Sequence, residues 1–381
     1  MLPLFLFLLL AFLVPIGSML ARGIADTDVA RALPRVTAEL KRWDGRELPD
    51  ESAYAALIAD IREAREAGSL ASAATRLNYD VAGFRSLLFV TGRQLPTTLT
   101  ASARQTLEAI DPKWGERETW AAIRRADGPV TDFYLLAALD LRRDAERSIV
   151  GAPPEQAVFR NVLGRTLWIS GMVTLICLAI GFPVAHFISR QKPATAGLLL
   201  FLVLLPFWTS LLVRTAAWVV LLQREGVLNN LFMSLGLIDA PVRMIFNRFA
   251  VYVAMVHVLL PFMVLPLYAV MKGISPTYAR AASSLGAAPL TAFLRVYLPQ
   301  TLPGVGAGCL MVFIQALGYY ITPALVGGAD DQMISYFIAF YASKTVNWGM
   351  AAALSVMLLA ATLALYAVYD RMIGIDKMRL G

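Results

Sequence analysis

The fold is decided by residues 278–304, which read YARAASSLGAAPLTAFLRVYLPQTLPG. This stretch contains two arginines, three prolines and two glycines, and it separates two runs that are each apolar enough to cross a bilayer. A punctuated insert of this kind between two spans indicates a segment that lies beside the membrane and has structure of its own.

Local signals in this insert predict a helix followed by a tight turn. Ser275 is a favoured N-cap residue and Pro276 suits the first helical turn, so the helix is predicted to begin there and to continue through Ser284. Gly286 stands where a glycine commonly ends a helix, because it adopts the left-handed conformation without steric cost.

A second helix is predicted from Pro289 to about Tyr297, with Pro299 preceding the next span. The predicted structure is therefore helix, turn, helix. Small residues line the first helix and would let the surface of another protein approach closely: Ala279, Ala281, Ala282, Ser283 and Ser284. The plain alternative is an Ala-rich helical connector that docks nothing.

Composition makes the chain an integral membrane protein, since 58% of its 381 residues are hydrophobic and only 16% are charged, against about a quarter in soluble domains. Residues 21–160 hold 20 basic and 21 acidic side chains, and the rest of the chain holds 14 and 6. The net charge of +7 thus belongs to the membrane part. This distribution indicates the positive-inside rule and a lipid environment, and it argues against nucleic-acid binding.

The apolar runs predict an all-α polytopic membrane protein with six transmembrane helices and a helical domain inserted between spans one and two. The first span is Leu2–Leu20, for which a cleaved signal peptide is the alternative. Five more spans are predicted at about 166–188, 195–222, 249–271, 301–323 and 348–370. The predicted organisation is a first span at 1–20, a polar helical domain at 21–160, a five-helix core at 161–371 with the loop 275–299, and a tail at 372–381.

No cofactor or metal is expected on this chain. Cys177 and Cys309 both lie in apolar runs, where cysteine is usually a small apolar residue, and no metal-ligand cluster stands out. No glycine is followed directly by lysine, so the chain lacks the phosphate-binding loop of an ATPase.

Charges between the predicted spans give an orientation. One alternating set of segments is almost purely basic, with Arg190, Lys192, Lys272, Arg280, Arg295, Arg371, Lys377 and Arg379 against Asp370 and Asp376. The other set mixes both signs, with Arg224, Glu225, Asp239, Arg243, Arg248, Asp330, Asp331 and Lys344. The positive-inside rule places the first set and both termini in the cytoplasm, and residues 21–160 outside.

The order of residues in the insert resembles the EAA loop of ABC importer permeases. Arg280, Ala281 and Ala282 are followed by Gly286 four residues later, and then by the Leu298–Pro299 pair. The likeness extends to Leu285, Ala287, Pro303 and Gly304. One residue departs from the family pattern, because Arg280 stands where the family has glutamate.

Four other stretches resemble the spermidine/putrescine branch of that family. They are FRNVLGRTLWIS at 159–170, PFWTSLLVRTAAWVVLL at 206–222, GVLNNLFMSLGLI at 226–238 and ALGYYITPALVGG at 316–328. The resemblance covers roughly residues 159–371, and the large outer domain resembles one subgroup of polyamine-type permeases.

This resemblance implies the fold and partners of a type I ABC importer of the bacterial inner membrane. The loop would form a coupling helix seated in a cytoplasmic ATPase dimer, which binds ATP in place of this chain. A second permease subunit, a different chain in this family, and an extracytoplasmic solute-binding protein would complete the assembly. The coupling residues implied are Tyr278, Arg280, Ala281, Ala282, Leu285, Gly286, Ala287, Leu298 and Pro299.

Candidates for the solute pathway are polar or aromatic residues inside predicted spans. Arg214 falls in mid-span, with Phe207, Leu211 and Trp218 on its helical face, and either lines the path or bonds to carbonyl groups or a partner. His257 is alone in its span and is interpreted as structural. The full set of pathway candidates is Trp208, Thr209, Arg214, Trp218, Tyr319 and Tyr320, whose aromatic members hold ammonium groups or form an interfacial belt.

The charge inventory leaves the solute open. No carboxylate occurs from Gln156 to Arg224 or from Ala240 to Ala329, although a polyamine would normally bind one. The carboxylate could come from a partner subunit, or from Asp330 and Asp331. The alternatives are an iron complex, an amino-acid-like compound or an anion as solute. A six-span sensor and a secondary transporter are the competing classes of protein, but the predicted cytoplasmic tail holds only about 11 residues and the spans hold no proton-relay acids.

Overall fold

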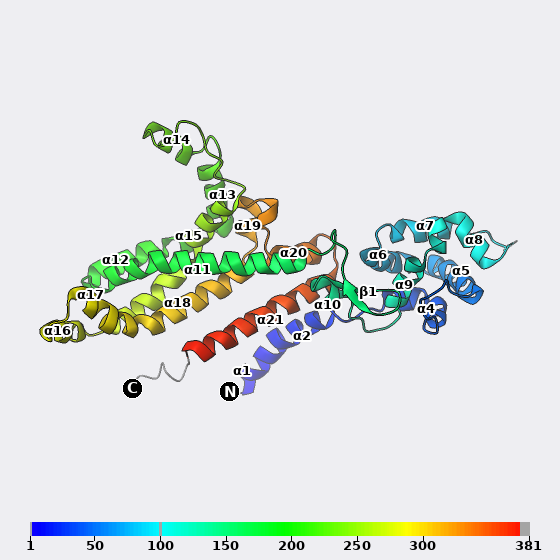
Figure 1. The fold of residues 1–381 in the computed structure, drawn as a ribbon, viewed down its shortest axis with the longest axis horizontal. Coiled ribbons are helices and arrows are strands. Elements are labelled where there is room, and N and C mark those ends of the chain that lie inside the picture. The colour runs from blue at the N-terminus through cyan, green and yellow to red at the C-terminus, as the bar shows by residue number, and fades with distance from the viewer. Residues whose placement is uncertain (1, 99–100, 374–381) are drawn as a thin grey trace. The chain divides into compact units, whose positions relative to one another are not determined.

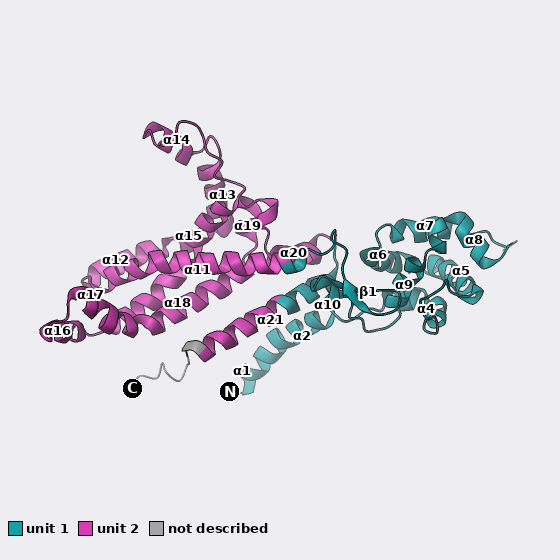
Figure 2. Ribbon diagram, in the orientation of Figure 1, with its two compact units in different colours: residues 1–160, 345–357 teal, residues 161–344, 358–381 magenta. Residues whose placement is uncertain are grey.

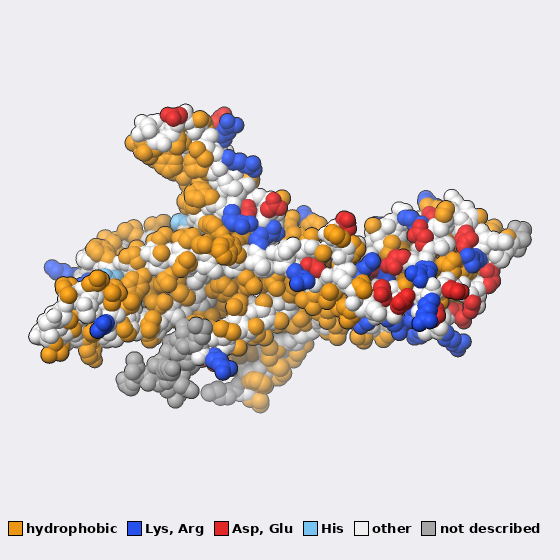
Figure 3. All heavy atoms as spheres, viewed as in Figure 1, with side chains coloured by type: hydrophobic (Ala, Val, Ile, Leu, Met, Phe, Trp, Pro, Cys, Tyr) orange, Lys and Arg blue, Asp and Glu red, His pale blue; other side chains and the backbone are white. Residues whose placement is uncertain are grey.

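The computed structural model describes residues 2–98 and 101–373 and is mostly helical (Figure 1). Hydrophobic side chains cover much of the long helices, and charged side chains gather on the polar domain (Figure 3). The chain divides into two compact units (Figure 2). Unit 1 comprises residues 1–160 and 345–357, and unit 2 comprises residues 161–344 and 358–381. Each unit has its own apolar core.

Unit 1 begins with an apolar helical stretch and continues as a domain of short helices. The first stretch is α1 (Leu2–Leu8), the π-helical segment η1 (Leu9–Leu13) and α2 (Val14–Ala21). The domain contains α3 (Asp28–Ala32), α4 (Pro34–Leu40), α5 (Glu51–Glu66), α6 (Leu70–Asp80), α7 (Phe84–Gln94), α8 (Ala103–Ile110), the 3₁₀ segment η2 (Pro112–Gly115), α9 (Arg117–Arg125) and α10 (Phe133–Ala138). The helical pattern predicted for residues 21–160 is confirmed over most of this segment.

A small antiparallel hairpin in unit 1 was not predicted. Strands β1 (Leu141–Arg143) and β2 (Ile149–Gly151) pair Leu141 with Gly151, and Arg147 in the connecting turn has φ of +68°. Each strand has three residues, and β1 is largely charged, so the sequence lacks the apolar alternation by which strands are recognised.

The core of the polar domain is built on aromatic side chains whose polar atoms are all bonded. Tyr54, Trp114 and Trp120 are fully buried. Tyr54 Oη and Trp120 Nε1 both donate to the Trp114 carbonyl, at 3.0 and 2.9 Å, and Trp114 Nε1 donates to Thr91 Oγ1 at 2.9 Å. Buried aromatics with satisfied polar atoms contribute both packing and orientation to a small core.

A buried ion pair joins the segment after α2 to the domain. Arg76 Nε donates to Asp26 Oδ2 at 2.6 Å, and both side chains are 1% exposed. The Arg76 guanidinium also lies 4.1 Å from the centroid of the Phe133 ring. Burial raises the pKa of the Asp26 carboxyl, which Arg76 opposes. Removing one partner of such a pair costs about 3–5 kcal/mol, because the other charge is left buried.

Unit 2 contains the long helices of the chain. They are α11 (Phe159–Ser189), α12 (Pro193–Leu204), the 3₁₀ segment η3 (Leu205–Trp208), α13 (Leu211–Leu222), α14 (Val227–Ser234), α15 (Arg248–Gly273), α16 (Pro276–Ser284), α17 (Pro289–Ala292), the π-helical segment η4 (Phe293–Tyr297), α18 (Leu298–Gly318), α19 (Ile321–Val326), the 3₁₀ segment η5 (Ala329–Asp331), α20 (Ile334–Ser343) and α21 (Trp348–Ile373), which begins in unit 1. Helix α15 lies at the centre of unit 2, with most of its apolar window buried.

The central helix is held by a methionine between two glycines. Met263 of α15 is fully buried. A Cβ atom at Gly181 of α11 would lie 2.8 Å from Met263 Cγ, and one at Gly308 of α18 would lie 2.7 Å from Met263 Sδ. Small residues at helix contacts let apolar helices approach closely, which is how helices associate in a membrane.

Replacing Gly308 by leucine is therefore expected to lower the thermal stability of the purified chain, because no space exists for a side chain beside Met263. Overpacking of this kind costs about 1–3 kcal/mol. The measurement is the melting temperature in detergent. The double variant Gly308→Leu/Met263→Ala removes the opposing side chain and is expected to regain most of the loss. A double variant no more stable than Gly308→Leu would show that the contact does not limit packing.

Among the described residues, five helices are long and apolar enough to cross a membrane, and a sixth span results if one bent pair is counted as a unit. The helices Leu2–Ala21, Phe159–Ser189, Arg248–Gly273 and Trp348–Arg371 confirm four predicted spans. Pro289–Gly318 confirms the span predicted at 301–323, with an earlier start and an end at Gly318. The run predicted as one span at 195–222 is present as a bent pair of helices with a break after Trp208. Lys377 and Arg379, in the predicted tail 372–381, lie outside the described residues.

Candidate functional site

The predicted helix and turn of the insert are confirmed. Ser275 Oγ accepts from the Thr277 amide at 3.3 Å, and α16 spans Pro276–Ser284. Gly286 has φ of +85°, and its amide donates to the Ser283 carbonyl at 3.0 Å. The Ala287 amide donates to the Ala282 carbonyl at 3.1 Å. These two bonds form a Schellman motif, which closes a helix on a left-handed glycine.

The turn projects apolar side chains away from the rest of unit 2. Leu285 is 89% exposed, Leu290 is 68% exposed and Tyr278 is 57% exposed. Nothing lies within 4 Å of a Cβ atom built on Gly286, so its backbone conformation alone requires glycine there. Ala281 is exposed and Ala282 half-buried on the small-residue helix. Exposed apolar residues around a rigid turn are typical of a docking surface.

The predicted interruption before Pro299 is wrong. The helix that starts at Pro289 runs through η4 into α18 without a break, so Leu298 and Pro299 form the first residues of α18 and do not belong to the exposed turn. Proline cannot donate the usual helical hydrogen bond. The π-helical turn η4 ends at Tyr297, and the Leu298 amide donates to the Phe293 carbonyl. This wider turn lets the helix continue although Pro299 has no amide hydrogen to donate.

The predicted third span is broken beside the middle of α15. Helix α12 and η3 end at Trp208, α13 begins at Leu211, and the two parts are bent by 94°. Thr209 and Ser210 stand in the break and are exposed, and Trp208 is 80% exposed. Helix breaks at membrane depth are tolerated only where they are buried in protein or line an aqueous cavity, and they mark binding sites in transporters.

Arg214 binds two carbonyl groups at this break, of which the Pro206 carbonyl also accepts from the Thr209 amide and hydroxyl. Its guanidinium donates to the Pro206 carbonyl, to the Thr209 carbonyl at 2.9 Å and to Thr209 Oγ1 at 3.3 Å. Of the alternatives open from the sequence, bonding to carbonyls is the one present in the structure. Arg214 lies one turn into α13 and is half-buried, which corrects the predicted mid-span position.

The predicted helical face around Arg214 is also corrected. Phe207 lies before the bend and packs on Phe262, with ring centroids 5.0 Å apart, so it does not share a helical face with Arg214. Trp218 does lie one turn beyond Arg214, and its Nε1 donates to His257 Nδ1 at 3.2 Å. His257, interpreted as structural from the sequence, therefore orients one of the candidate aromatic rings.

A second helix break lies beside α13. Helix α18 ends at Gly318, and α19 starts at Ile321 after Tyr319 and Tyr320. Ser335 Oγ donates to the Tyr319 carbonyl at 2.6 Å, and Tyr320 is 41% exposed.

The hydroxyl pair Thr215 and Thr322, 3.2 Å apart and buried, joins α13 to α19. The structure thus brings Arg214, Trp218 and the two tyrosines to neighbouring helix breaks. Sequence reasoning missed Thr215, Thr322 and Ser335, whose only signal was a polar residue within an apolar run.

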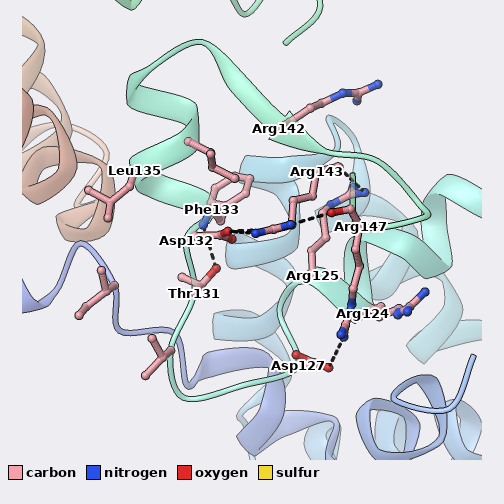
Figure 4. Close-up of a pocket in the computed structure, with 13 residues that line it drawn as sticks. Arg124, Arg125, Asp127, Thr131, Asp132, Phe133, Leu135, Arg142, Arg143 and Arg147 are labelled. Carbon is pink, nitrogen blue, oxygen red and sulfur yellow. Dashed lines mark hydrogen bonds and ion pairs between the residues drawn. The ribbon is translucent and has the colours of Figure 1, made fainter. Parts of the chain in front are cut away.

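The polar domain of unit 1 contains an arginine-lined pocket of about 550 Å³ (Figure 4). Arg125 donates to Asp80 at 2.7 Å and to Glu118 at 2.8 Å, while Arg143 pairs with Asp132 at 2.6 Å. Although burial opposes its charge, these acids raise the pKa of the Arg125 guanidinium. The pairs connect the hairpin to α9 and to its surroundings, so the pocket wall is an internal ionic network.

In the part of the chain that the structure describes, no group of three or more His, Cys, Asp or Glu side chains could hold a metal ion. The chemistry of unit 2 is instead that of a membrane bundle with two distinct regions. One end presents the exposed turn after α16, and the two helix breaks lie further along α15. At the first break Phe207 packs on Phe262 of α15, and beyond it Trp218 bonds to His257 of the same helix.

Comparisons with known proteins agree with this arrangement. The chain is 38% identical over 214 residues to the spermidine/putrescine transport system permease protein PotB of Haemophilus influenzae, covering 56% of this chain and 75% of that protein. It is 36% identical over 214 residues to the PotB protein of Escherichia coli K12, covering 56% and 78%. It is 30% identical to the E. coli inner membrane ABC transporter permease protein YdcU, covering 56% and 72%. No protein-family model matches the chain.

Solved structures with some likeness include a bacterial alginate ABC transporter in complex with a periplasmic protein. It covers 58% of this chain and 80% of that chain at 18% identity, with a TM-score of 0.48. An amino acid ABC transporter covers 58% and 94% at 17% identity, with a TM-score of 0.37.

The relatives at 30–38% identity, each covered over more than two thirds of its length, show that this bundle of apolar helices is a membrane permease subunit of the ABC transporter class. Within that class, the chain belongs to the PotB family of ABC importer permeases. It is a multi-pass protein of the bacterial inner membrane.

Proposed function

We propose that this chain forms half of the translocation pathway of an ATP-driven importer for spermidine and putrescine. Hydrolysis of ATP takes place on a separate cytoplasmic ATPase dimer. A second permease subunit completes the pathway, and an extracytoplasmic solute-binding protein delivers the solute. The observation that carries the proposal is the rigid, apolar and exposed turn that closes α16 on Gly286.

The turn is suited to transmit force. A Schellman motif fixes the direction in which the chain leaves α16, and η4 then continues into α18 without a loop. A displacement of the turn is therefore carried into a transmembrane helix by continuous helical backbone. Tyr278, Arg280, Ala281, Ala282, Leu285, Gly286 and Ala287 are the residues proposed to contact the ATPase.

The proposed solute contacts lie at the two helix breaks. Trp208, Trp218, Tyr319 and Tyr320 supply aromatic faces, each worth about 0.5–2 kcal/mol to an ammonium group. Asp331 is engaged by Arg248 at 2.9 Å, so the carboxylate that a polyamine normally binds is assigned to the exposed Asp330, to the partner subunit or to the binding protein.

The proposed orientation follows the charges. Both termini and the turn after α16 lie in the cytoplasm, and residues 21–160 lie outside. Protease added to intact spheroplasts should then cut within residues 21–156 and spare the turn. Another solute remains the second candidate, because no acidic side chain occurs at 157–223 or 241–329 and Arg214 adds a positive charge at the first break.

The test is a pull-down of the tagged chain in mild detergent with mass spectrometry, followed by uptake of labelled spermidine and putrescine. Competition by an amino acid, an iron complex and an inorganic anion addresses the second candidate. An ATPase and a second permease in stoichiometric amounts, with polyamine uptake, would support the proposal. Recovery of the chain alone would overturn the importer assembly and favour a sensor. Assembly without polyamine uptake would overturn only the solute.

A further inference from the structure

A cavity of about 530 Å³ opens where α16 meets the ends of the transmembrane helices. Its walls come from the end of α11, the end of α15, the first turns of α16 and the segment from η4 into α18. Three of its lining side chains are cations: Arg190, Lys272 and Arg280. None of the lining residues is acidic.

The three cations have few partners among the described residues. Lys272 Nζ lies 3.3 and 3.5 Å from the carbonyl oxygens of Ser189 and Gln191. Arg280 makes one long hydrogen bond of 3.4 Å, to Thr277 Oγ1. Arg190 lies over the Tyr297 ring at 5.9 Å. In contrast to the arginine-lined pocket of unit 1, where Arg125, Arg143 and Arg147 are each paired with an acid, most of these donors are open to a ligand.

We propose that this cavity binds a phosphate-bearing anion, supplied by the headgroup of an anionic phospholipid. Guanidinium and ammonium groups bind phosphate oxygens through charge-assisted hydrogen bonds. The hydroxyl group of Tyr278 lines the same cavity and provides a further donor. The volume falls within the range of about 300–1,000 Å³ that is usual for small-molecule sites.

The position of the cavity favours lipid as the source. The two apolar helices that reach it end at Ser189 and Gly273, so the cavity lies at the boundary between the bilayer and water, where headgroup phosphates lie. Basic pockets between transmembrane helices on the cytoplasmic side are recognised sites for anionic headgroups. The inference rests on the proposed function only for the placement of this end in the cytoplasm.

A bound headgroup would restrain α16. Arg280 comes from α16 itself, Lys272 from α15 and Arg190 from the segment after α11. One phosphate that contacts all three cations would connect the turn after α16 to two transmembrane helices. Transport would then depend on the anionic lipid content of the membrane.

The test compares lipid binding by the purified full chain in nanodiscs of phosphatidylcholine with and without phosphatidylglycerol. The variant is Arg190→Gln/Lys272→Gln/Arg280→Gln. The matched control Arg224→Gln/Arg243→Gln/Lys344→Gln removes the same charge from exposed residues elsewhere in unit 2. Native mass spectrometry measures how much phosphatidylglycerol the protein retains. A second arm measures protection by inorganic phosphate, as the increase in melting temperature that it causes.

We expect the control to retain phosphatidylglycerol like the wild type, and the cavity variant to lose about fivefold in affinity for each charge removed. If the cavity variant instead loses only the protection by inorganic phosphate, the cavity is an anion site whose ligand is free phosphate and not a lipid headgroup. Equal behaviour of the two variants in both arms would overturn the site. If the triple variant misfolds, the single variant Lys272→Gln, at an exposed position, replaces it in both arms. Because neither ATPase nor uptake enters this measurement, its outcome is independent of the importer assembly.

Discussion

Replacing Gly286 by proline is expected to reduce solute uptake by more than about tenfold while the amount of chain in the membrane stays unchanged. Proline fixes φ near −65°, whereas Gly286 has φ of +85°. It also removes the amide that donates to Ser283 at 3.0 Å. The Schellman turn cannot form with proline, so the exposed Leu285 would point in another direction.

The matched control is Gly286→Asn, because asparagine adopts the left-handed conformation at low cost. It is expected to keep uptake within about twofold of the wild type. Uptake by cells and membrane abundance by immunoblot are the two measurements. Normal uptake by the proline variant would contradict the role of this turn in coupling. Loss of both variants from the membrane would instead indicate a folding role.

The second large effect is expected at Arg214. Replacement by alanine takes the Arg214 donor from the Thr209 carbonyl, while the Pro206 carbonyl keeps the Thr209 amide and hydroxyl as donors. It should destabilise the chain by about 1.5–3 kcal/mol, the contribution of one hydrogen bond to a charged group. Uptake should fall with stability. Arg214→Lys should be intermediate, because a single ammonium group cannot reproduce a planar fork with several donors.

Melting temperature and the KM of uptake together separate the two roles of Arg214. Arg224→Ala, at an exposed loop position, is the control for loss of a nearby positive charge. An alanine variant with wild-type melting temperature but altered KM would show direct contact with the solute. It would contradict the interpretation that Arg214 holds the helix break.

The docking turn could be predicted from sequence because its determinants are local. Ser275, Pro276 and Gly286 each act within one helical turn of their own position, so no tertiary contact is needed to recognise them. The continuation through Pro299 could not be predicted in the same way. It depends on a π-helical turn whose formation reflects packing of Phe293 and Tyr297 around His186, 111 residues from Tyr297 in the sequence.

The broken helices were missed for a related reason. Hydropathy is high on both sides of Thr209, and spans tolerate a residue such as Pro206, so the run at 195–222 has the composition of one straight helix. Hydropathy does not report the contacts at the bend: Arg214 binds the Thr209 carbonyl five residues before it, and Thr215 meets Thr322, 107 residues away beside the other break. The hairpin at 141–151 was missed because its strands are short and charged.

The scarcity of carboxylates in unit 2 has a consequence for the energy source of transport. Residues 157–223 and 241–329, which include both helix breaks, contain no side chain that titrates around pH 4. The chain has only two histidines, His186 and His257. A carrier driven by a proton gradient needs an acid or base in its spans that loads and unloads a proton in each cycle. Apart from these two histidines, residues 157–223 and 241–329 have no side chain whose charge a mildly acidic medium would change, so few groups could couple a proton gradient to transport.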